Sequence, residues 1–303
     1  MITPGREQVI ENIRRKALEG RLNDKVETGD PSLTSDERSA VLRKYIDVRR
    51  KAPFRIRNFV AGRMADLITW KVNRDTEITG LEKLSDIKGG AIITSNHFNP
   101  DENTAIRLLS QKMKKGNLYV VSQDSNLKMP GLFGFFMYYM DVIPVSKDYH
   151  YMRKHFDRLI DEALGRGQNI HVYPEQEMWF NYRKPRPVKR GAYLYAARHN
   201  VPVISCFNEI VDLPEHDSGD FHKVKYVLHV LDPIYPQEGL TERENSMRMA
   251  AKDYEQKCRA YEECYGRKLT YEFEERDIAG WEPGLEERMG RRINEQKHER
   301  ING

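Results

Sequence analysis

Residues 90–123 read GAIITSNHFNPDENTAIRLLSQKMKKGNLYVVSQ, and this stretch decides the fold class. An apolar run ends at Asn96, an apolar stripe with helical spacing follows at Ile106, Leu109 and Met113, and a second apolar run closes the stretch. Short apolar strands that alternate with helices are typical of an α/β domain with a largely parallel sheet.

The same alternation continues toward the C-terminus. Strands are expected in IPV (143–145), NIHVYPE (169–175), VPVISCFNEI (201–210) and VKYVLHVLDPI (224–234), and helices at 151–167, at 191–200 and after the capping pair Thr241 and Glu244. The predicted fold is therefore α/β, with a mostly parallel central sheet flanked by helices and an N-terminal helical extension.

The chain divides into four predicted segments. Residues 1–48 form a helical extension of two polar helices, the second capped by Ser35, and residues 49–78 form a basic amphipathic segment at a membrane surface. Residues 79–270 form the α/β domain. Residues 271–303 lack apolar periodicity and are expected to be a charged tail, either a surface helix or partly disordered.

Composition narrows the class of protein. Of the 303 residues, 32% are charged, and no apolar run approaches the roughly 18 residues that a membrane span needs. The N-terminus lacks the features of a signal peptide, and the three cysteines, without CxxC spacing, indicate a reducing cytoplasm rather than a zinc finger. A net charge of +4 is too small to indicate nucleic acid as a partner.

Residues 49–74 combine positive charge with apolar side chains. They hold eight Lys or Arg residues against one acid, with Phe54, Phe59, Leu67 and Trp70 among the apolar residues between them. Such a helix can lie in the interface of a membrane that contains anionic lipid. The alternative is a helix that docks on the core and leaves a solvated basic face.

The motif SNHFNPDEN, residues 95–103, places His97 between a strand and a helix, where α/β folds commonly hold their chemistry. A neutral imidazole there can take a proton from a hydroxyl if a carboxylate fixes its tautomer. In the alternative interpretation Asn99 caps the helix and Glu102 reaches back to it, which leaves His97 as a loop residue.

Four blocks together resemble the glycerolipid acyltransferase family, of the 1-acyl-glycerol-3-phosphate and lysophospholipid acyltransferase type. The Asn-His-x4-Asp block of the family is similar to Asn96, His97 and the position of Glu102, which gives a His-x4-Glu variant. The other blocks are similar to 143–147, which ends in Lys147, to Pro174-Glu175, and to Val201-Pro202-Val203. The resemblance covers about residues 80–235.

The sequence departs from the family at three positions. Glu102 stands where the family has Asp, and Asp101 lies beside it. Lys147 stands where the family usually has Arg, and a lysine lacks the bidentate geometry of a guanidinium on phosphate. Gln176-Glu177 replaces the Gly-Thr of the third block, so we expect a different acceptor pocket.

The resemblance implies a direct acyl transfer. His97 would be the general base on the acceptor hydroxyl, and Glu102 would orient it, with Asp101 in reserve. The donor would be an acyl thioester of coenzyme A or of acyl carrier protein, with no bound cofactor and no metal. The acceptor and its phosphate or other anion would be bound by a further set of residues: Lys147, Glu175, Arg183, Lys184 and Lys189. These last three belong to the cationic run 183–190, which could instead be a solvated surface loop.

These features predict a peripheral enzyme at the cytoplasmic face of the membrane, with anionic lipid surface, a lipid acceptor and acyl carrier protein as the partners considered. Two other functions stay open. One is a metallohydrolase with His97, Glu102, His171 and Glu175 as ligands, although no pair of ligands shares one element at the usual spacing. The other is a lipid-binding protein of the same fold without catalysis.

Overall fold

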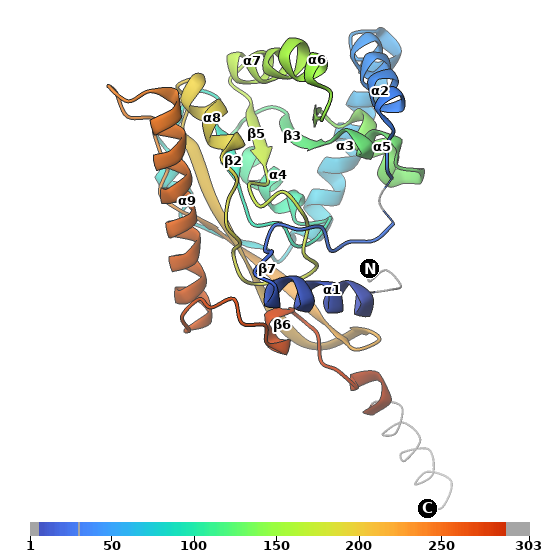
Figure 1. The fold of residues 1–303 in the computed structure, drawn as a ribbon, viewed down its shortest axis with the longest axis vertical. Coiled ribbons are helices and arrows are strands. Elements are labelled where there is room, and N and C mark those ends of the chain that lie inside the picture. Colours follow the sequence, from blue (N-terminus) through green and yellow to red (C-terminus); the bar gives the residue numbers. More distant parts are fainter. Residues whose placement is uncertain (1–5, 30, 289–303) are drawn as a thin grey trace, which may run out of the picture.

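Within residues 6–29 and 31–288, which the computed structural model describes, a seven-stranded sheet forms the centre of the molecule in the order β1-β7-β6-β2-β5-β3-β4 (Figure 1). All neighbouring strands are parallel except the β6–β7 pair, which is antiparallel. The predicted α/β class and mostly parallel sheet are confirmed. The strands are β1 (Glu77–Thr79), β2 (Ile92–Thr94), β3 (Leu118–Gln123), β4 (Val142–Val145), β5 (Asn169–Val172), β6 (Val203–Ser218) and β7 (Phe221–Val230).

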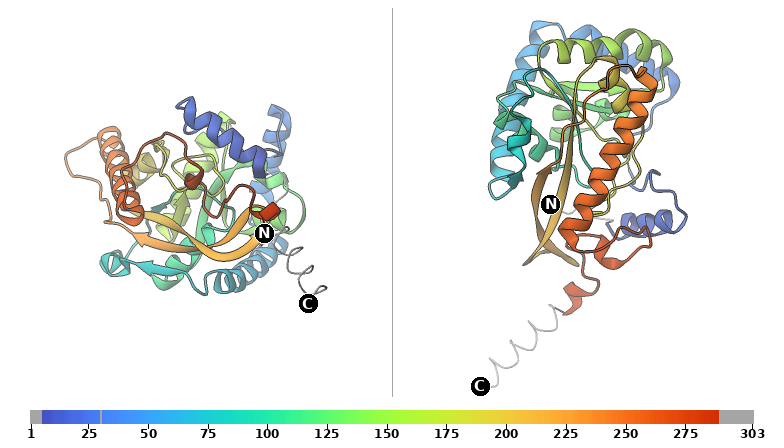
Figure 2. Two further views of the ribbon diagram at one scale, coloured as in Figure 1. Left: turned by 90° about the horizontal axis from the view of Figure 1, so that it is seen from below. Right: turned by 90° about the vertical axis from the view of Figure 1, so that its left-hand side faces the viewer.

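Helices cover both faces of the sheet because successive apolar residues of a strand point to opposite sides. Ile93 packs in one cluster with α4 (Asn103–Lys112), and its neighbour Ile92 packs in another with α7 (Asp157–Gly165) and α8 (Gly191–Arg198). Figure 2 shows α3 (Ala52–Val72) along one side of the molecule and α9 (Glu242–Tyr265) along the other, with the sheet between them.

Smaller helices close the top of the molecule in Figure 1. These are α2 (Ser35–Val48), α5 (Gly131–Tyr139) and α6 (Tyr149–Tyr151), which continues into a π-helical segment at Met152–Phe156. The cap of α2 is Thr34, in a capping box with Glu37, rather than Ser35. From α2, the Tyr45 hydroxyl donates a hydrogen bond of 2.7 Å to the Val142 carbonyl of β4, which fixes the helix to the sheet.

The predicted charged tail is wrong for the residues that follow 270. Ile278 is 1% exposed and Ala279 is fully buried, and isolated bridges join Ile278 to Tyr182 and Trp281 to Phe221. Together with α1 (Arg6–Leu18), this segment covers the free end of the β6–β7 ribbon (Figure 1). Residues 289–303 of the expected tail lie outside the described residues.

The basic segment forms α3. One face of this helix packs on the core, and the other face is exposed. Phe54 is buried, against the expectation of a lipid-facing side chain, and packs on Tyr45 and Tyr139. Large apolar side chains on the outer face are exposed at Ile56, Phe59, Val60, Leu67, Trp70 and Val72. None of the described helices combines the length and apolar character needed to cross a bilayer.

Candidate active site

His97 lies at the edge of the sheet where the parallel strands end. It follows β2, and the neighbouring strand β5 ends beside it at Val172, so that Tyr173 comes next to the imidazole. The two rings are stacked, with centroids 3.7 Å apart and planes inclined by 12°. Stacking on an aromatic face restricts the rotation of the imidazole, so its two nitrogens have fixed directions.

His97 and Glu102 form a direct pair. The Nδ1 atom of His97 hydrogen bonds to Oε1 of Glu102, whose side chain is fully buried. With the proton on Nδ1 donated to the carboxylate, Nε2 carries a lone pair and can accept a proton. The His97 side chain keeps 19% exposure, so this nitrogen is within reach of a ligand.

The second oxygen of Glu102 holds the backbone of the same loop. Oε2 accepts hydrogen bonds from the backbone N–H groups of Phe98, at 2.6 Å, and Asn99, at 3.0 Å. The two alternatives from the sequence, a partner for His97 or a group that caps the start of the helix, therefore describe different oxygens of one carboxylate. Both contacts are present.

Burial and hydrogen bonding act in opposite directions on Glu102. Burial raises the pKa of its carboxyl group, while the neighbouring His97 and the amides of Phe98 and Asn99 oppose that rise. Burial also raises the pKa of the Tyr173 hydroxyl far above its usual range, and the charge of Glu102 adds to the effect. Tyr173 therefore stays neutral beside the carboxylate.

Asp101 is exposed and does not face His97. Its backbone N–H donates a hydrogen bond of 3.0 Å to Oδ1 of Asn99, which shapes the turn before α4. The geometry favours Glu102 over Asp101 as the partner of His97, while the roles of both stay predictions.

His171 is buried behind the site. Its Nε2 atom lies 2.9 Å from the Ser95 hydroxyl, and its Nδ1 atom has no hydrogen-bond partner among the described residues. Burial, assisted by the charges of His97 and Lys257, lowers the pKa of His171 to about 3. It is therefore a neutral core residue. Of the four side chains of the metallohydrolase alternative, His97 and Glu102 pair with each other, whereas His171 contacts Ser95 and Glu175 contacts Arg186.

Glu175 is buried and fully engaged by protein groups. Oε1 accepts from the backbone N–H of Arg186 at 2.9 Å, and Oε2 accepts from the Arg186 guanidinium and from the backbone N–H of His97 at 3.2 Å. Arg186, 1% exposed, also donates to the carbonyls of His97 and Glu177 and lies over the Trp179 ring. Glu175 thus supports the His97 loop from below and has no free oxygen for an acceptor.

Arg183 and Lys184 are neither on a solvated loop nor open to an anion. Arg183 pairs with Asp212 at 2.5 Å, and Lys184 pairs with Asp277 at 2.6 Å. Both cations are buried, with 7% and 3% exposure. They tie the loop after β5 to the ribbon and to the C-terminal segment, which corrects their predicted contact with phosphate.

Lys147 and Lys189 are the exposed members of the predicted cationic set. The backbone N–H of Lys189 donates to the Pro174 carbonyl at 2.7 Å, which places this residue beside the loop that contains Glu175. Lys147 follows β4, and two strands, β3 and β5, separate β4 from the strand that carries His97. Both lie at the edge of the sheet where strands β2, β3, β4 and β5 end.

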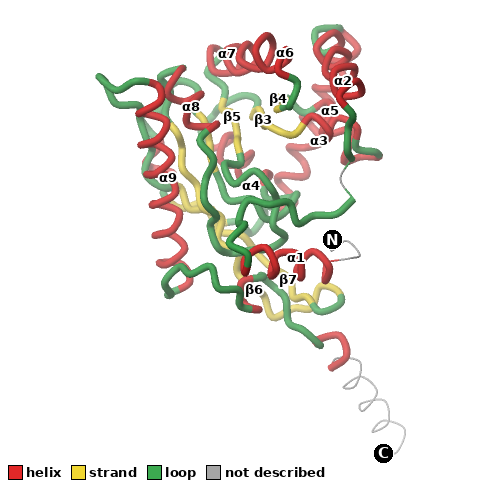
Figure 3. Tube along the Cα trace, viewed as in Figure 1, coloured by secondary structure: helices red, strands yellow, loops and turns green. Residues whose placement is uncertain are grey.

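Several residues that position His97 were missed by sequence reasoning. Trp179 and Asn181 donate backbone hydrogen bonds to the carbonyls of His97 and Phe98, at 3.1 and 2.9 Å. In addition, Asn96 exchanges two hydrogen bonds with the backbone of Asn208 on β6. Figure 3 shows the segment between β5 and α8 as a long loop, and loops lack the periodicity from which such contacts could be inferred. For Tyr173 a signal exists, since it alternates with His171 and Glu175 at the end of a strand.

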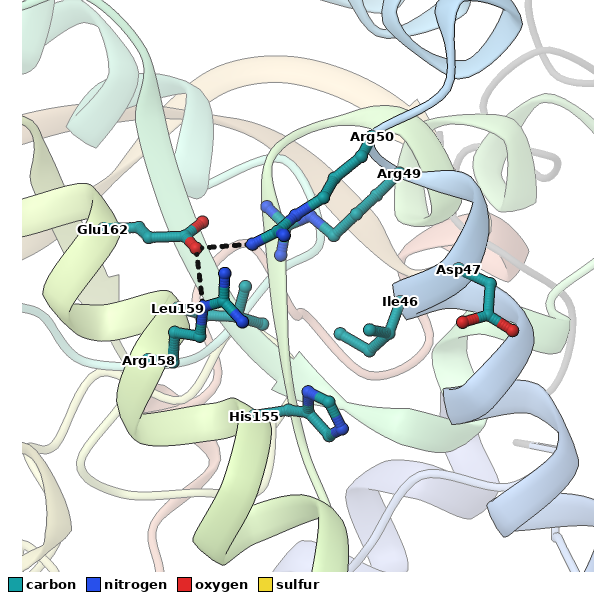
Figure 4. A pocket seen from close by; sticks show the side chains of 8 residues that line it. All are labelled: Ile46, Asp47, Arg49, Arg50, His155, Arg158, Leu159 and Glu162. Atoms are coloured by element: carbon teal, nitrogen blue, oxygen red, sulfur yellow. Dashed lines mark hydrogen bonds and ion pairs between the residues drawn. The ribbon is translucent and has the colours of Figure 1, made fainter.

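A hollow of about 240 Å³ lies away from this edge, between α2 and the helices that cover the opposite end of β4 (Figure 4). Glu162 occupies one side, where it accepts from Arg50 at 2.8 Å and from Arg158 at 3.0 Å. None of the residues proposed for chemistry lines it. The hollow therefore supplies no argument about the reaction.

The central part of the chain is similar in sequence to a known protein family. The family model described as Acyltransferase matches residues 75–208, which include His97, Glu102, Lys147 and Glu175. This part of the chain is an acyltransferase-family domain. The predicted resemblance is thereby confirmed, and the match begins just before β1 and ends at the Asn208 that binds Asn96.

The crystal structure of the 1-acyl-sn-glycerophosphate (LPA) acyltransferase PlsC from Thermotoga maritima is similar to the chain at 16% identity and a TM-score of 0.46. The match covers 77% of this chain and 90% of that chain. The comparison with curated proteins finds no match.

The acyltransferase domain explains one of the departures from the family pattern. Gln176 has a φ of 71°, in the left-handed region, where the Gly of the family's third block would sit without strain. Gln176 therefore adopts a backbone conformation that favours glycine. The preceding residue, Glu175, contacts His97 and Arg186.

Proposed function

We propose that the acyltransferase domain moves a fatty acyl group from a thioester to a hydroxyl group of a lysophospholipid or similar glycerolipid acceptor. The observation that carries this proposal is the His97–Glu102 pair, with a buried carboxylate on Nδ1 and Nε2 left as an acceptor. This is the arrangement that a general base needs.

The proposed reaction needs no nucleophilic side chain. His97 takes the proton from the acceptor hydroxyl while the oxygen attacks the thioester carbonyl, which forms the new C–O bond. The C–S bond then breaks, and the leaving thiolate receives the proton held by His97. Glu102 stabilises the imidazolium between these steps, because one oxygen faces Nδ1 of His97 and the other is fixed by the loop backbone.

Lys147 and Lys189 are proposed to attract the anionic part of the acceptor or donor. They are exposed, whereas Arg183 and Lys184 are buried and already pair with Asp212 and Asp277. The donor is proposed to be an acyl thioester of coenzyme A or of acyl carrier protein, whose thiolate is a good leaving group.

We propose peripheral binding to the cytoplasmic face of a membrane through α3. Its exposed face carries Phe59, Leu67 and Trp70, each at least 65% exposed, next to Arg55 and Lys71. A large exposed apolar patch with a basic border is the surface that binds an anionic lipid interface. The further apolar residues Leu132 and Phe133 of α5 are also exposed.

Substitution of the base tests the proposed reaction. His97→Ala and His97→Gln should lower acyl transfer to a panel of lysophospholipids by a factor of roughly 10² or more, as expected for a lost general base. Circular dichroism and thermal unfolding check that each variant is folded. Near-normal turnover in a folded variant would exclude His97 as the base.

The same panel separates catalysis from simple lipid binding. If the wild-type protein binds anionic vesicles but transfers no acyl group from any thioester tested, the chain is a lipid-binding member of the family. Turnover that survives treatment with chelators would exclude the metallohydrolase alternative.

A further inference from the structure

A mixed cluster of side chains lies outside the proposed active site, where the last turn of α9 crosses the sheet. Among the described residues, Glu209, His229 and Cys264 form a group whose ligand atoms all lie within 4.8 Å of one another. They come from β6, β7 and α9. No part of the acyl-transfer proposal uses them.

The sheet register brings the cluster together. His229 of β7 lies opposite Phe207 of β6, and Glu209 is two residues further along the same face. Diagonal neighbours on one face of an antiparallel pair are within reach of long side chains. Phe207 packs in one cluster with Tyr261 and Cys264, which places α9 on this face.

Glu209 and Cys264 both contact the same ring nitrogen of His229. Oε2 of Glu209 lies 2.8 Å from Nε2 of His229, and Sγ of Cys264 lies 3.4 Å from the same Nε2. In a tetrahedral zinc site with Zn–N of about 2.0 Å and Zn–S of about 2.3 Å, the nitrogen and sulfur are about 3.5 Å apart. The N–S separation therefore already fits, and the Glu209 oxygen lies within 4.8 Å of both other ligand atoms.

The opposite side of the imidazole is fixed in the way metal sites require. Nδ1 of His229 is hydrogen bonded to the Thr79 hydroxyl at 3.1 Å, and Thr79 is paired with His229 in the parallel β1–β7 register. Histidine ligands commonly bind a partner through the nitrogen that does not hold the metal, which orients the ring and fixes its tautomer.

We propose that Glu209, His229 and Cys264 bind a zinc ion, with water in the fourth position. Imidazole and thiolate ligands favour zinc over magnesium or calcium, which take oxygen ligands. The His229 and Glu209 side chains are 24% and 18% exposed, so an ion and its water can enter. Burial and the charge of Glu209 raise the pKa of the Cys264 thiol to about 12, and a coordinated cation displaces that proton.

The proposed ion would join segments that are distant in the chain. Cys264 is 35 residues from His229, and His229 is 20 residues from Glu209. Coordination would fasten the end of α9 to β6 and β7, next to Asn208, which holds Asn96 before His97. A ligand that binds only the folded chain raises its stability in a concentration-dependent way.

Cobalt(II) provides the direct test, because a cobalt–thiolate bond gives a charge-transfer band in the near ultraviolet. Reduced, chelator-treated wild-type protein titrated with cobalt(II) should develop this band with one equivalent bound. Cys264→Ser should abolish the band, and His229→Gln should weaken binding at least 10-fold. Thr79→Val should weaken it by roughly 10- to 100-fold, as for other residues that orient a ligand.

Matched controls lie elsewhere on the molecule. His222 forms a similar pair with Glu282 at 2.7 Å, but this pair is not part of the Glu209–His229–Cys264 group, and Cys258 is a second partly buried cysteine. His222→Gln and Cys258→Ser should leave the band and affinity unchanged. Zinc should raise the melting temperature of wild type and of both controls, but not that of Cys264→Ser.

Two outcomes would overturn the proposal. One is a wild-type protein that binds no more cobalt(II) than Cys264→Ser. The other is a charge-transfer band that persists in Cys264→Ser and is lost in Cys258→Ser, which would place the metal on a different thiol. Circular dichroism of each variant ensures that lost binding is not lost folding, and Thr79→Val supplies a variant that keeps all three ligands.

Discussion

The two oxygens of Glu102 have separate tasks, and this division decides how a substitution acts. One oxygen faces Nδ1 of His97, and the other accepts from the amides of Phe98 and Asn99. A glutamine keeps one carbonyl oxygen for the amides but presents an NH2 group to His97. It therefore opposes the required tautomer while it preserves most of the backbone contacts.

We expect Glu102→Gln to lower kcat by roughly 10² or more, with a small change in melting temperature. Asp101→Asn is the matched control, because Asp101 is the adjacent carboxylate and is exposed. It should retain activity within about twofold. Steady-state kinetics and thermal unfolding of the two variants make the comparison.

Two results would contradict this assignment. A larger loss in Asp101→Asn than in Glu102→Gln would move the orienting role to Asp101. Equal and small losses of activity, with a clear drop in melting temperature for Glu102→Gln alone, would leave Glu102 with its backbone role only.

His171 predicts how stability depends on pH. Its pKa is about 3 in the folded protein and near 6.5 when exposed, so the unfolded chain binds more protons between these values. Stability from this group is fully present above about pH 6.5 and is lost as the pH falls, by at most about 1.4 kcal/mol per pH unit. His171→Gln should be less stable at pH 7.5 but should show a shallower fall toward pH 4.5.

Denaturant unfolding of both proteins at several pH values measures these slopes. Parallel curves for wild type and His171→Gln would show that His171 does not govern the acid sensitivity.

For individual residues, the sequence predicted the His97–Glu102 pair but not the residues that support it. His97 and Glu102 share one short motif, and their spacing carries the information. Arg186 and Asn208 reach the loop from positions far along the chain, and nothing in a local pattern relates them to His97. Arg183 and Lys184 were predicted to bind an anion because their carboxylate partners, Asp212 and Asp277, are distant in sequence.

Among the elements, α3 combines two structural features that the sequence analysis treated as alternatives: contact with the core and an exposed apolar face. One face packs on α4, where Asp66 pairs with Arg107 at 2.7 Å, and Phe54 is buried against α2 and α5. The opposite face exposes Phe59, Leu67 and Trp70. The helix is therefore docked on the core and still presents an apolar surface.

We expect the wild-type protein to co-sediment with anionic vesicles, more weakly in high salt but still measurably. Salt screens the attraction of the cations, each worth at most about 1 kcal/mol, but does not remove apolar burial. Replacement of Phe59, Leu67 and Trp70 by Ser should abolish the salt-resistant part. Leu18→Ser, which removes an apolar side chain that is 71% exposed on α1, is the control.

Turnover of a short-chain, water-soluble acceptor should survive in the triple variant, because no substituted residue contacts the His97 loop. If wild-type protein does not sediment with anionic vesicles at low salt, α3 is not the membrane contact.

Most elements were predictable because their apolar spacing is regular. The strand β1 was missed since it has only three residues, and its pairing with β7 spans about half the chain. The π-helical segment Met152–Phe156 lies inside a helix whose periodicity gave no sign of it. The buried tail was missed because Ile278 and Ala279 stand among charged residues without a period of 2 or 3.6.

Across the whole molecule, a buried ion pair connects the site loop with the C-terminal segment. Lys184 and Asp277 are 3% and 0% exposed, and Arg183 joins the same loop to Asp212 of β6. Removal of one partner from a buried pair leaves an uncompensated charge, which costs far more than loss of an exposed cation.

We expect Lys184→Ala to lower the free energy of unfolding by roughly 3 kcal/mol. Lys189→Ala, five residues away and exposed, should change it by less than about 0.5 kcal/mol. Lys189→Ala should instead raise KM for an anionic acceptor. Equal stability of the two variants would show that the Lys184–Asp277 pair does not hold the segments together.

The contacts around His97 also set the moment at which the protein becomes active during its own synthesis. The loop receives support from the Leu22 carbonyl through Arg186 and from Ala279 through Asn181, so its anchors span nearly the entire described chain. A ribosome releases the chain from its N-terminus, so the residues around Ala279 emerge well after the site loop itself. Until Ala279 has been synthesised and has folded back, Phe98 of the site loop lacks part of its cover.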